Sequence, residues 1–233
     1  MILASGPYIS THFADTAVRN GWPIVDAGQA CEAGMPPGVP FQLQRLAADR
    51  IEHAADLRLL SNSENALGWL ESQAPTSRQN QAARLFKDKA AFRRSLSADY
   101  PDLRFAEVSL EQLSAFQPDQ DAYPLVIKPA VGFFSIGVHR VDDARQWESA
   151  KRDILAEVPR AAANFPEHVL SQTRFLLESW IEGDEYAVDA YYDDNGDPVI
   201  LNILEHRFAS ADDVSDRLYL SSRDIIESVM PGA

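Results

Sequence analysis

Residues 123–141, which read Y-P-L-V-I-K-P-A-V-G-F-F-S-I-G-V-H-R-V, contain the pattern that decides the fold. Their apolar run 125–127 is rich in β-branched residues, and it predicts a buried strand that ends at Lys128. A loop with two glycines and Ser135 follows, and a second strand is predicted over 138–141. Backbone N–H groups near glycines can approach an anion closely, and a lysine supplies a point charge. The pattern therefore suits a phosphate-binding hairpin, although solvated lysines and simple turns produce the same letters.

The composition is that of a globular protein with an acidic surface. The chain has 233 residues, enough for one large domain or two small ones, and 45% of them are hydrophobic and 24% charged. Its formal net charge is −14, from 35 acidic and 21 basic residues. Such a charge argues against non-specific binding to nucleic acid or to an anionic membrane.

Cysteine content and the N-terminal residues predict a cytoplasmic location. The single cysteine, Cys31, cannot form an internal disulfide, which favours a reducing compartment. The first residues, M-I-L-A-S-G-P-Y, lack the basic start and apolar core of a signal peptide. No apolar window approaches the roughly 18 residues that a membrane-spanning helix requires.

The first third of the chain alternates between strand and helix patterns, which predicts an α/β layer with a parallel sheet. Asn62 or Ser63 is placed to cap the last of these helices. The expected elements are a strand at 2–4, a helix at 11–20, a strand at 23–28, a Gly/Pro-rich loop at 28–40, a helix at 41–55, a strand at 57–61 and a helix beginning near 62.

Residues 73–80 form the best candidate linker, and mixed helices and strands follow. Asp142 is placed to cap a helix, and Asn195-Gly196 favours a tight hairpin turn. The expected elements are helices at 79–97, after 109, at 142–158 and at 222–230, with strands at 105–109, 173–180, 185–192 and 198–208. After Phe208 no further pair of strands is predicted.

Four segments in this order are more specific than any one of them. They are K-D-K at 87–89, V-I-K-P at 126–129, the Gly/Ser loop at 132–137, and L-E-S-W-I-E-G-D-E-Y-A-V-D at 177–189. Over residues 78–208 the series resembles the ATP-grasp superfamily, which includes D-alanine–D-alanine ligase and biotin carboxylase. The resemblance implies an α/β fold with an N-terminal Rossmann-like pre-ATP-grasp domain over 1–75 and an incomplete ATP-grasp (α+β) domain over 76–233.

Carried over by position, the resemblance implies three phosphate contacts. Lys128 would hold the α- and β-phosphates, and Lys89 would approach the phosphates from the smaller subdomain, with Lys87 as the alternative. Ser135 and the loop 132–137 would close over the β- and γ-phosphates. The ordinary reading of Lys89 is a solvated helix lysine.

The same resemblance implies the contacts to the nucleoside. Glu178 would accept a hydrogen bond from the adenine amino group, and the backbone from Ser179 to Ile181 would read the adenine edge. Glu185 would accept hydrogen bonds from the ribose hydroxyls, as a carboxylate can from a cis-diol. Each of the two glutamates could instead be an ordinary carboxylate on a strand face.

Two features depart from the family pattern. Phe133 and Phe134 make the phosphate loop bulkier than is usual, and the acidic E-x-N motif that binds magnesium in the family is not found here. Three aspartates in the polar stretch after Phe208, namely Asp212, Asp213 and Asp216, are interpreted as solvated charge. We therefore expect ATP as the ligand, with Mg²⁺ implied by the family but no metal-binding residues identified in this chain.

These expectations lead to one leading function and two alternatives. The leading hypothesis is the ATP-binding portion of a carboxylate–amine ligase that acts through an acyl phosphate, with this chain inactive by itself. The alternatives are a non-catalytic nucleotide-binding or regulatory module, and a fragment completed by a partner chain. Expected partners are a nucleotide, a carboxylate and an amine, with no nucleic acid and no membrane, and self-association is possible through exposed apolar surface.

Overall fold

A computed structural model describes residues 1–38, 59–132, 135–162, 170–193, 195–210 and 217–230. The chain forms two compact units, the first running from Met1 to Ala98 and the second beginning at Asp99. Among the described residues, no helix is both long and apolar enough to cross a membrane. The domain boundary predicted at 75/76 lies within the first of these units and stays a prediction.

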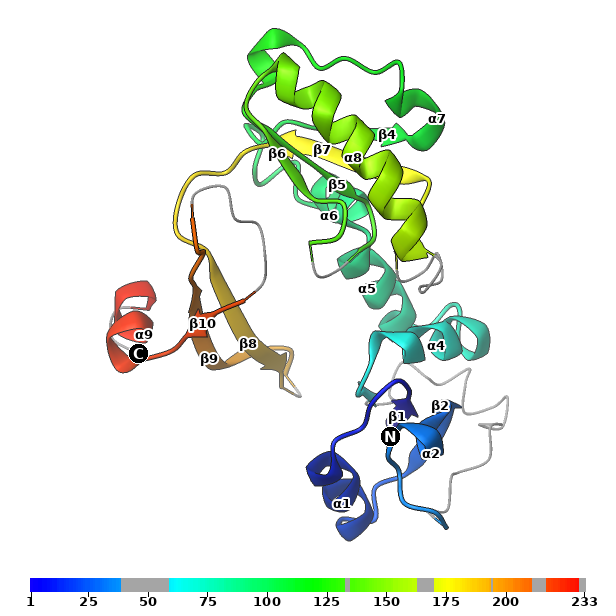
Figure 1. The fold of residues 1–233 in the computed structure, drawn as a ribbon. Coiled ribbons are helices and arrows are strands. Elements are labelled where there is room, and N and C mark those ends of the chain that lie inside the picture. Colours follow the sequence, from blue (N-terminus) through cyan, green and yellow to red (C-terminus); the bar gives the residue numbers. More distant parts are fainter. Residues whose placement is uncertain (39–58, 133–134, 163–169, 194, 211–216, 231–233) are drawn as a thin grey trace. The chain divides into compact units, whose positions relative to one another are not determined.

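The first unit contains the predicted parallel sheet (Figure 1). Strands β1 (Ile2–Ser5), β2 (Ile24–Gly28) and β3 (Leu60–Ser61) pair in the order β2-β1-β3, and both pairings are parallel. Helix α1 (Thr11–Arg19) connects the first two strands, as expected. A short helix, α2 (Ala30–Ala33), lies where a loop was predicted, and the predicted helix at 41–55 lies outside the described residues.

Ser63, rather than Asn62, caps the helical segment after β3. The Ser63 side chain accepts a hydrogen bond from the Asn65 N–H at the start of the 3₁₀ helix η2 (Glu64–Ala66), which leads into α4 (Leu67–Gln73). Asn62 instead connects two strand ends, because its Oδ1 accepts a 2.8 Å hydrogen bond from the Ser5 N–H.

The single helix predicted over 79–97 is in fact two helices, α5 (Arg78–Lys87) and α6 (Lys89–Ser95). Asp88 separates them with an extended backbone (φ −85°, ψ 99°), and its Oδ1 accepts a 2.9 Å hydrogen bond from the Ala91 N–H. Aspartate competes for backbone donors in this way and so favours a cap over a helix interior. The K-D-K motif therefore lies across a helix break.

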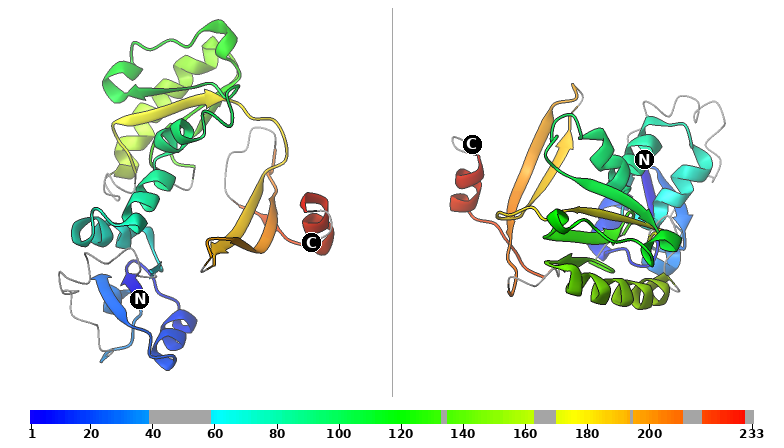
Figure 2. Two further views of the ribbon diagram at one scale, coloured as in Figure 1. Left: turned by 180° about the vertical axis from the view of Figure 1, so that it is seen from behind. Right: turned by 90° about the horizontal axis from the view of Figure 1, so that it is seen from above.

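The second unit is built on a four-stranded antiparallel sheet. Strands β4 (Phe105–Ser109), β5 (Leu125–Pro129), β6 (His139–Val141) and β7 (Arg174–Ser179) pair in the order β4-β7-β5-β6. Helix α8 (Ala144–Ala162) lies along one face of this sheet in every view (Figures 1 and 2). Two short helices, α7 (Leu110–Leu113) and η3 (Gln120–Ala122), connect β4 to β5.

Strand alternation sorts the side chains of this sheet into two sets. The first set faces α8 and forms the core. Its buried members are Val108, Leu125, Ile127, Val141, Phe175 and Leu177 from the strands and Trp147, Ala150, Ile154 and Val158 from α8. The second set, which includes Val126, Lys128 and Glu178, lies on the opposite face. The face opposite α8, called the charged face below, thus carries Lys128 and Glu178 beside the buried Val126 and Leu176.

The N-terminus of α8 is capped by Asp143 rather than by the predicted Asp142. Asp143 Oδ1 accepts hydrogen bonds from the N–H groups of Arg145 (2.8 Å) and Gln146 (2.9 Å). These two hydrogen bonds stabilise the charged carboxylate and lower the pKa of Asp143. Asp142 instead pairs with Arg140, whose Nε lies 2.8 Å from its Oδ1.

A smaller antiparallel sheet follows, with strand order β10-β9-β8. Its strands are β8 (Tyr186–Tyr192), β9 (Pro198–His206) and β10 (Tyr219–Leu220), and helix α9 (Arg223–Val229) packs beside β9 (Figure 1). The predicted turn is present, with Gly196 at φ 86°. After Phe208, where no further pair of strands was predicted, the described residues contain one two-residue strand, β10, which pairs with β9. Asp212, Asp213 and Asp216 lie outside the described residues.

Candidate functional site

Lys128 and Glu178 form an ion pair on the charged face of the four-stranded sheet. Glu178 on β7 lies opposite Val126, and Lys128 follows two residues later on the same strand as Val126, so both side chains are on one face. The Lys128 Nζ donates a hydrogen bond to the Glu178 Oε1, and the two side chains are 18% and 5% exposed. Low solvent access strengthens this attraction, which fixes the ammonium group at the end of β5.

This pairing bears on the adenine contact predicted for Glu178. A carboxylate has two oxygens that together accept several hydrogen bonds. Pairing with Lys128 is therefore compatible with a further hydrogen bond from an adenine amino group, and that contact stays a prediction. The residue predicted to contact adenine touches the residue predicted to contact the phosphates, so the two predicted contacts belong to one connected pair.

Two backbone N–H groups, one at the last residue of β7 and one just after it, already donate hydrogen bonds to other parts of the chain. The Ser179 N–H donates to the Arg104 carbonyl (2.9 Å), and the Trp180 N–H donates to the Pro124 carbonyl (3.1 Å). Any reading of an adenine edge by residues 179–181 would consequently fall to their carbonyl groups and to the N–H of Ile181, whose residue is 61% exposed. The predicted contact between this backbone and adenine can therefore involve only these carbonyl groups and the Ile181 N–H.

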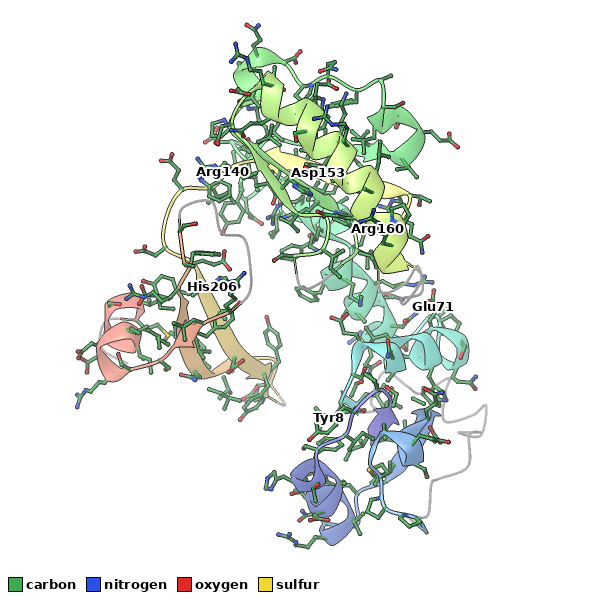
Figure 3. All side chains as sticks on the ribbon, viewed as in Figure 1. Tyr8, Glu71, Arg140, Asp153, Arg160 and His206 are labelled. Carbon is green, nitrogen blue, oxygen red and sulfur yellow. The ribbon has the colours of Figure 1, made fainter. Side chains whose placement is uncertain are left out.

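Arg140 is a cation of this face that the sequence analysis did not select. It lies opposite Val126 in the β5–β6 pairing, so it shares the face of Lys128 and Glu178. Its guanidinium carbon lies 4.4 Å from the ring centroid of Trp180, a cation–π arrangement, and Arg140 is labelled in Figure 3. Side chains alternate between the two faces of a strand. The core position of Val141 could therefore have placed the neighbouring Arg140 on the opposite face.

Parts of the predicted phosphate loop have the geometry of a tight turn. Ser135 has a positive φ of 56°, and its carbonyl accepts a 3.1 Å hydrogen bond from the Val138 N–H. Gly137 has φ 68°, and a Cβ at this position would lie 3.0 Å from Val158 Cγ2. Glycine is therefore required here on two grounds. Phe133 and Phe134 lie outside the described residues, and closure of the loop over phosphates stays a prediction.

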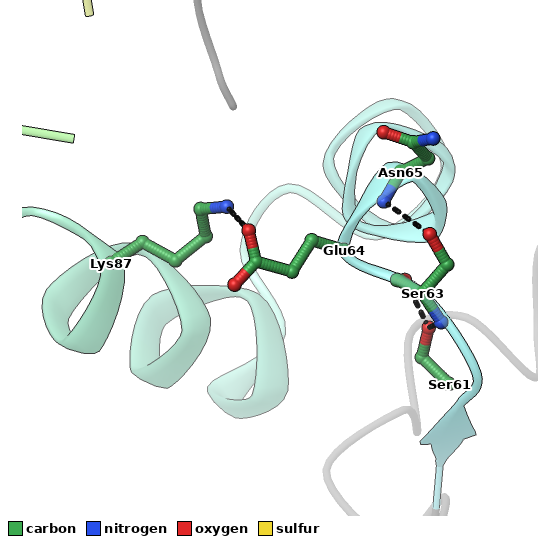
Figure 4. A network of polar contacts seen from close by, with 5 residues as sticks. All are labelled: Ser61, Ser63, Glu64, Asn65 and Lys87. Atoms are coloured by element: carbon green, nitrogen blue, oxygen red, sulfur yellow. Dashed lines mark hydrogen bonds and ion pairs between the residues drawn. The ribbon is translucent and has the colours of Figure 1, made fainter. Parts of the chain in front are cut away.

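The two lysines of the K-D-K motif have different local roles in the first unit. Lys87 Nζ lies 2.6 Å from Glu64 Oε2, beside the network of Ser61, Ser63 and Asn65 that begins the α4 segment (Figure 4). Lys87 thus has an ion-pair partner in the first unit, whereas Lys89 begins α6, and the contact of either lysine with the phosphates stays a prediction.

Glu185 is the residue before β8, and it pairs with His206 at the end of β9. The Glu185 Oε1 lies 2.9 Å from His206 Nδ1, and the His206 N–H donates a 2.8 Å hydrogen bond to the Glu185 carbonyl. The side chain of Glu185 is 61% exposed, whereas that of His206 is 4% exposed. Glu185 thus presents an oriented carboxylate to solvent.

A cavity of about 210 Å³ lies on the second unit, and its lining includes two of the predicted site residues, Glu178 and Ser179. The lining also includes Phe116, Ala122, Leu125 and Leu177, and the last two belong to the face covered by α8. Drug-sized ligands occupy roughly 300–1,000 Å³. This cavity is therefore too small for a whole nucleotide, although Glu178, the partner of Lys128, is among its lining residues. In the described part of the chain, no group of three or more His, Cys, Asp or Glu side chains could hold a metal ion.

A comparison with protein families gives one match, which covers part of the second unit. Residues 121–232 match the family described as "ATP-grasp domain". This range includes Lys128, the loop after it, Glu178 and Glu185.

Solved structures resemble the chain at low sequence identity. The L-amino acid ligase of Bacillus licheniformis has a TM-score of 0.62 and 20% identity over 94% of this chain and 55% of that protein. The ADP complex of N5-carboxyaminoimidazole synthetase from Staphylococcus aureus has a TM-score of 0.52 and 12% identity over 88% of this chain and 55% of that one. This chain thus spans about half the length of these enzymes, and at such identities the likeness shows the fold.

A third comparison gives a short match to a protein of another kind. An 86-residue stretch is 36% identical to the error-prone DNA polymerase of Anaeromyxobacter dehalogenans, covering 36% of this chain and 7% of the polymerase. So small a share of the polymerase shows no common domain organisation. The match of residues 121–232 to the ATP-grasp domain agrees with the fold of the solved structures that the chain resembles.

Proposed function

We propose that this chain is the nucleotide-binding part of an ATP-dependent carboxylate–amine ligase. The observation that carries the proposal is the Lys128–Glu178 pair, which lies on the charged face of the four-stranded sheet within the segment that matches the ATP-grasp domain. Lys128 and Arg140 give this face two cations in a chain whose net charge is −14. Each of these cations is paired with a carboxylate, Lys128 with Glu178 and Arg140 with Asp142.

The residues divide the nucleotide among three groups. The Lys128 ammonium offsets the charge of the α- and β-phosphates, and Ser135 contributes from the adjoining turn. Glu178 and the 179–181 backbone recognise adenine, and Glu185 accepts hydrogen bonds from the ribose hydroxyls. Lys89 adds a second ammonium to the phosphates.

The reaction belongs to the whole protein. A substrate carboxylate attacks the γ-phosphorus of ATP, which forms an acyl phosphate and breaks the bond to ADP. An amine then attacks the acyl carbon, forms the C–N bond and releases inorganic phosphate. Phosphoryl transfer of this kind uses metal ions to neutralise developing charge. Because the described residues contain no cluster of carboxylates suited to Mg²⁺, we assign no metal ligand to this chain.

Calorimetric titration with ATP and magnesium tests the proposal. Wild type should bind ATP, and Lys128→Met should weaken binding roughly tenfold or more, the range for losing a hydrogen bond to a charged group. Lys87→Met is the matched control, because Lys87 pairs with Glu64 in the first unit and should leave affinity unchanged. Absence of binding by wild type, or equal affinity in the Lys128 variant, would overturn the proposal.

A further inference from the structure

His206 is connected to Glu185 at two points, by backbone and by side chain. The His206 N–H donates to the Glu185 carbonyl, and its Nδ1 lies 2.9 Å from Glu185 Oε1. The ring is 4% exposed, whereas the carboxylate that it contacts is 61% exposed. The buried His206 ring therefore orients the exposed Glu185 carboxylate (His206 is labelled in Figure 3).

The chemistry of this contact fixes which ring nitrogen carries the proton. An ionised carboxylate accepts hydrogen bonds and donates none. In this contact the Nδ1 of His206 therefore carries a proton, which it donates to Oε1 of Glu185. A defined donor at one oxygen sets the plane of the carboxylate and directs its remaining lone pairs.

Two aromatic residues hold the His206 ring in place. The Tyr219 ring is stacked on it, with centroids 4.5 Å apart and an angle of 15° between the planes, and the Phe208 centroid lies 4.0 Å away at 48°. Tyr219 is also the residue that pairs with His206 between β10 and β9. These two ring contacts hold the His206 side chain in one rotamer, so its Nδ1–H keeps one direction.

We propose that His206 is a positioning residue, which fixes the Glu185 carboxylate for the hydroxyl groups of a ribose. The inference rests on the proposed nucleotide-binding function, and it gives a role to a histidine that the sequence did not single out as functional. Orienting the carboxylate before binding avoids paying its rotational entropy when the ligand arrives.

Affinity for ATP and for 2′,3′-dideoxy-ATP, measured by calorimetry, tests the role. His206→Phe keeps a ring between Tyr219 and Phe208 but removes the donor, so binding of ATP should weaken roughly five- to tenfold. Binding of the dideoxy nucleotide should not change, because it lacks both hydroxyls. His206→Asn restores an N–H near the position of Nδ1 and should recover part of the affinity for ATP. Equal loss for both nucleotides, or no loss for either, would overturn the proposal.

A second variant covers the case in which His206→Phe fails to fold. Tyr219→Ala leaves both members of the pair in place but removes the stacked ring, and it should likewise reduce the preference for ATP over the dideoxy nucleotide. A change that affects both nucleotides equally would assign His206 to structure alone.

Nitrogen-15 NMR of the ligand-free protein separates this inference from the proposed function. Wild type should show the His206 ring protonated at Nδ1, and Glu185→Gln should shift that signal. If wild type has this signal but binds no ATP, the nucleotide function fails together with the positioning role. If ATP binds but the proton is on Nε2, the positioning role alone is overturned.

Discussion

The two sheets of the second unit differ in how much of their surface they bury. The four-stranded sheet packs on α8 with fully buried side chains such as Phe175 and Trp147. On the three-stranded sheet, Ile203 and His206 are buried, whereas Leu201 is 68% exposed. Each sheet has one carboxylate that we propose binds the nucleotide. It is Glu178 on β7 in the four-stranded sheet and Glu185, just before β8, in the three-stranded sheet.

This difference separates two ways of holding a carboxylate. Glu178 is fixed by the surrounding sheet and by a buried ion pair, so its position depends on the stability of the whole unit. Glu185 lies on a small sheet, and its orientation depends on one histidine and the rings around it. The predictions below change the same kind of residue in each sheet.

Removing a leucine side chain should give the largest contrast in stability. Leu177→Ala, at a buried position facing α8, should lower the free energy of unfolding by about 2–5 kcal/mol. Leu201→Ala on β9 should change it by no more than about 0.5 kcal/mol, because little apolar surface is lost there. Urea denaturation measures both values, and equal costs would show that the three-stranded sheet contributes as much core as the other.

The two acid–base pairs should also differ in stability. Lys128→Met removes the cation beside the buried Glu178 and should cost about 2 kcal/mol. Glu185→Gln, at an exposed carboxylate, should cost less than about 1 kcal/mol. Adding Glu178→Gln to the Lys128 variant should recover part of the loss, as measured by urea denaturation. Simple additivity of the two changes would mean that the ion pair is not coupled.

Glycines in the two hairpins should respond differently to alanine. Gly137 and Gly196 both have positive φ, but a Cβ at Gly137 would also press on Val158, whereas nothing lies within 4 Å at Gly196. Gly196→Ala should cost about 1 kcal/mol from backbone strain, and Gly137→Ala about 2 kcal/mol or more. Thermal unfolding of the two variants compares them, and a larger cost at Gly196 would contradict the described packing.

Each region also has an exposed aspartate whose folded-state pKa is lowered, and these should give the smallest effects. Hydrogen bonds from backbone N–H groups lower the pKa of Asp143 at α8 and of Asp193 in the β8–β9 turn. Their stabilisation is therefore complete well above pH 3.8, the unfolded value, and is lost as pH falls through the lowered folded value.

Asp143→Asn and Asp193→Asn should each reduce the loss of stability in acid. Urea denaturation between pH 6 and pH 2.5, chosen to span roughly the range in which carboxylates titrate, measures this. The difference between each variant and wild type should shrink as pH falls below 3.8. A constant difference across that range would mean that the charge of the carboxylate does not stabilise either site.

Local pattern predicted most of the strands of the second unit, because alternation and turn residues are local properties. The β5–β6 hairpin, β7, β8 and β9 lie close to where their apolar pattern placed them. Capping was harder, because neighbouring residues compete for the same backbone donors. Asp88 divided a helix, and Asp143 took the role expected of Asp142.

Lys128 and Glu178 lie on the strands that were predicted for them, but their pairing could not be predicted. The contact between Lys128 and Glu178 depends on register between β5 and β7, which are separated by 50 residues in the sequence. The role of His206 depends on Tyr219, in a two-residue strand too short to show any periodicity. Such pairings are tertiary properties, and one sequence does not specify them by pattern.

The most direct test of whether a single nucleotide contacts both sheets is hydrogen–deuterium exchange with and without ATP–magnesium. Slower exchange should appear in two places, the hairpin around β5 and the segment from residue 179 through β8 and the end of β9. Both effects should weaken in Lys128→Met. Slowing in one sheet alone, or in neither, would contradict the assignment of Lys128 and Glu185 to a single ligand.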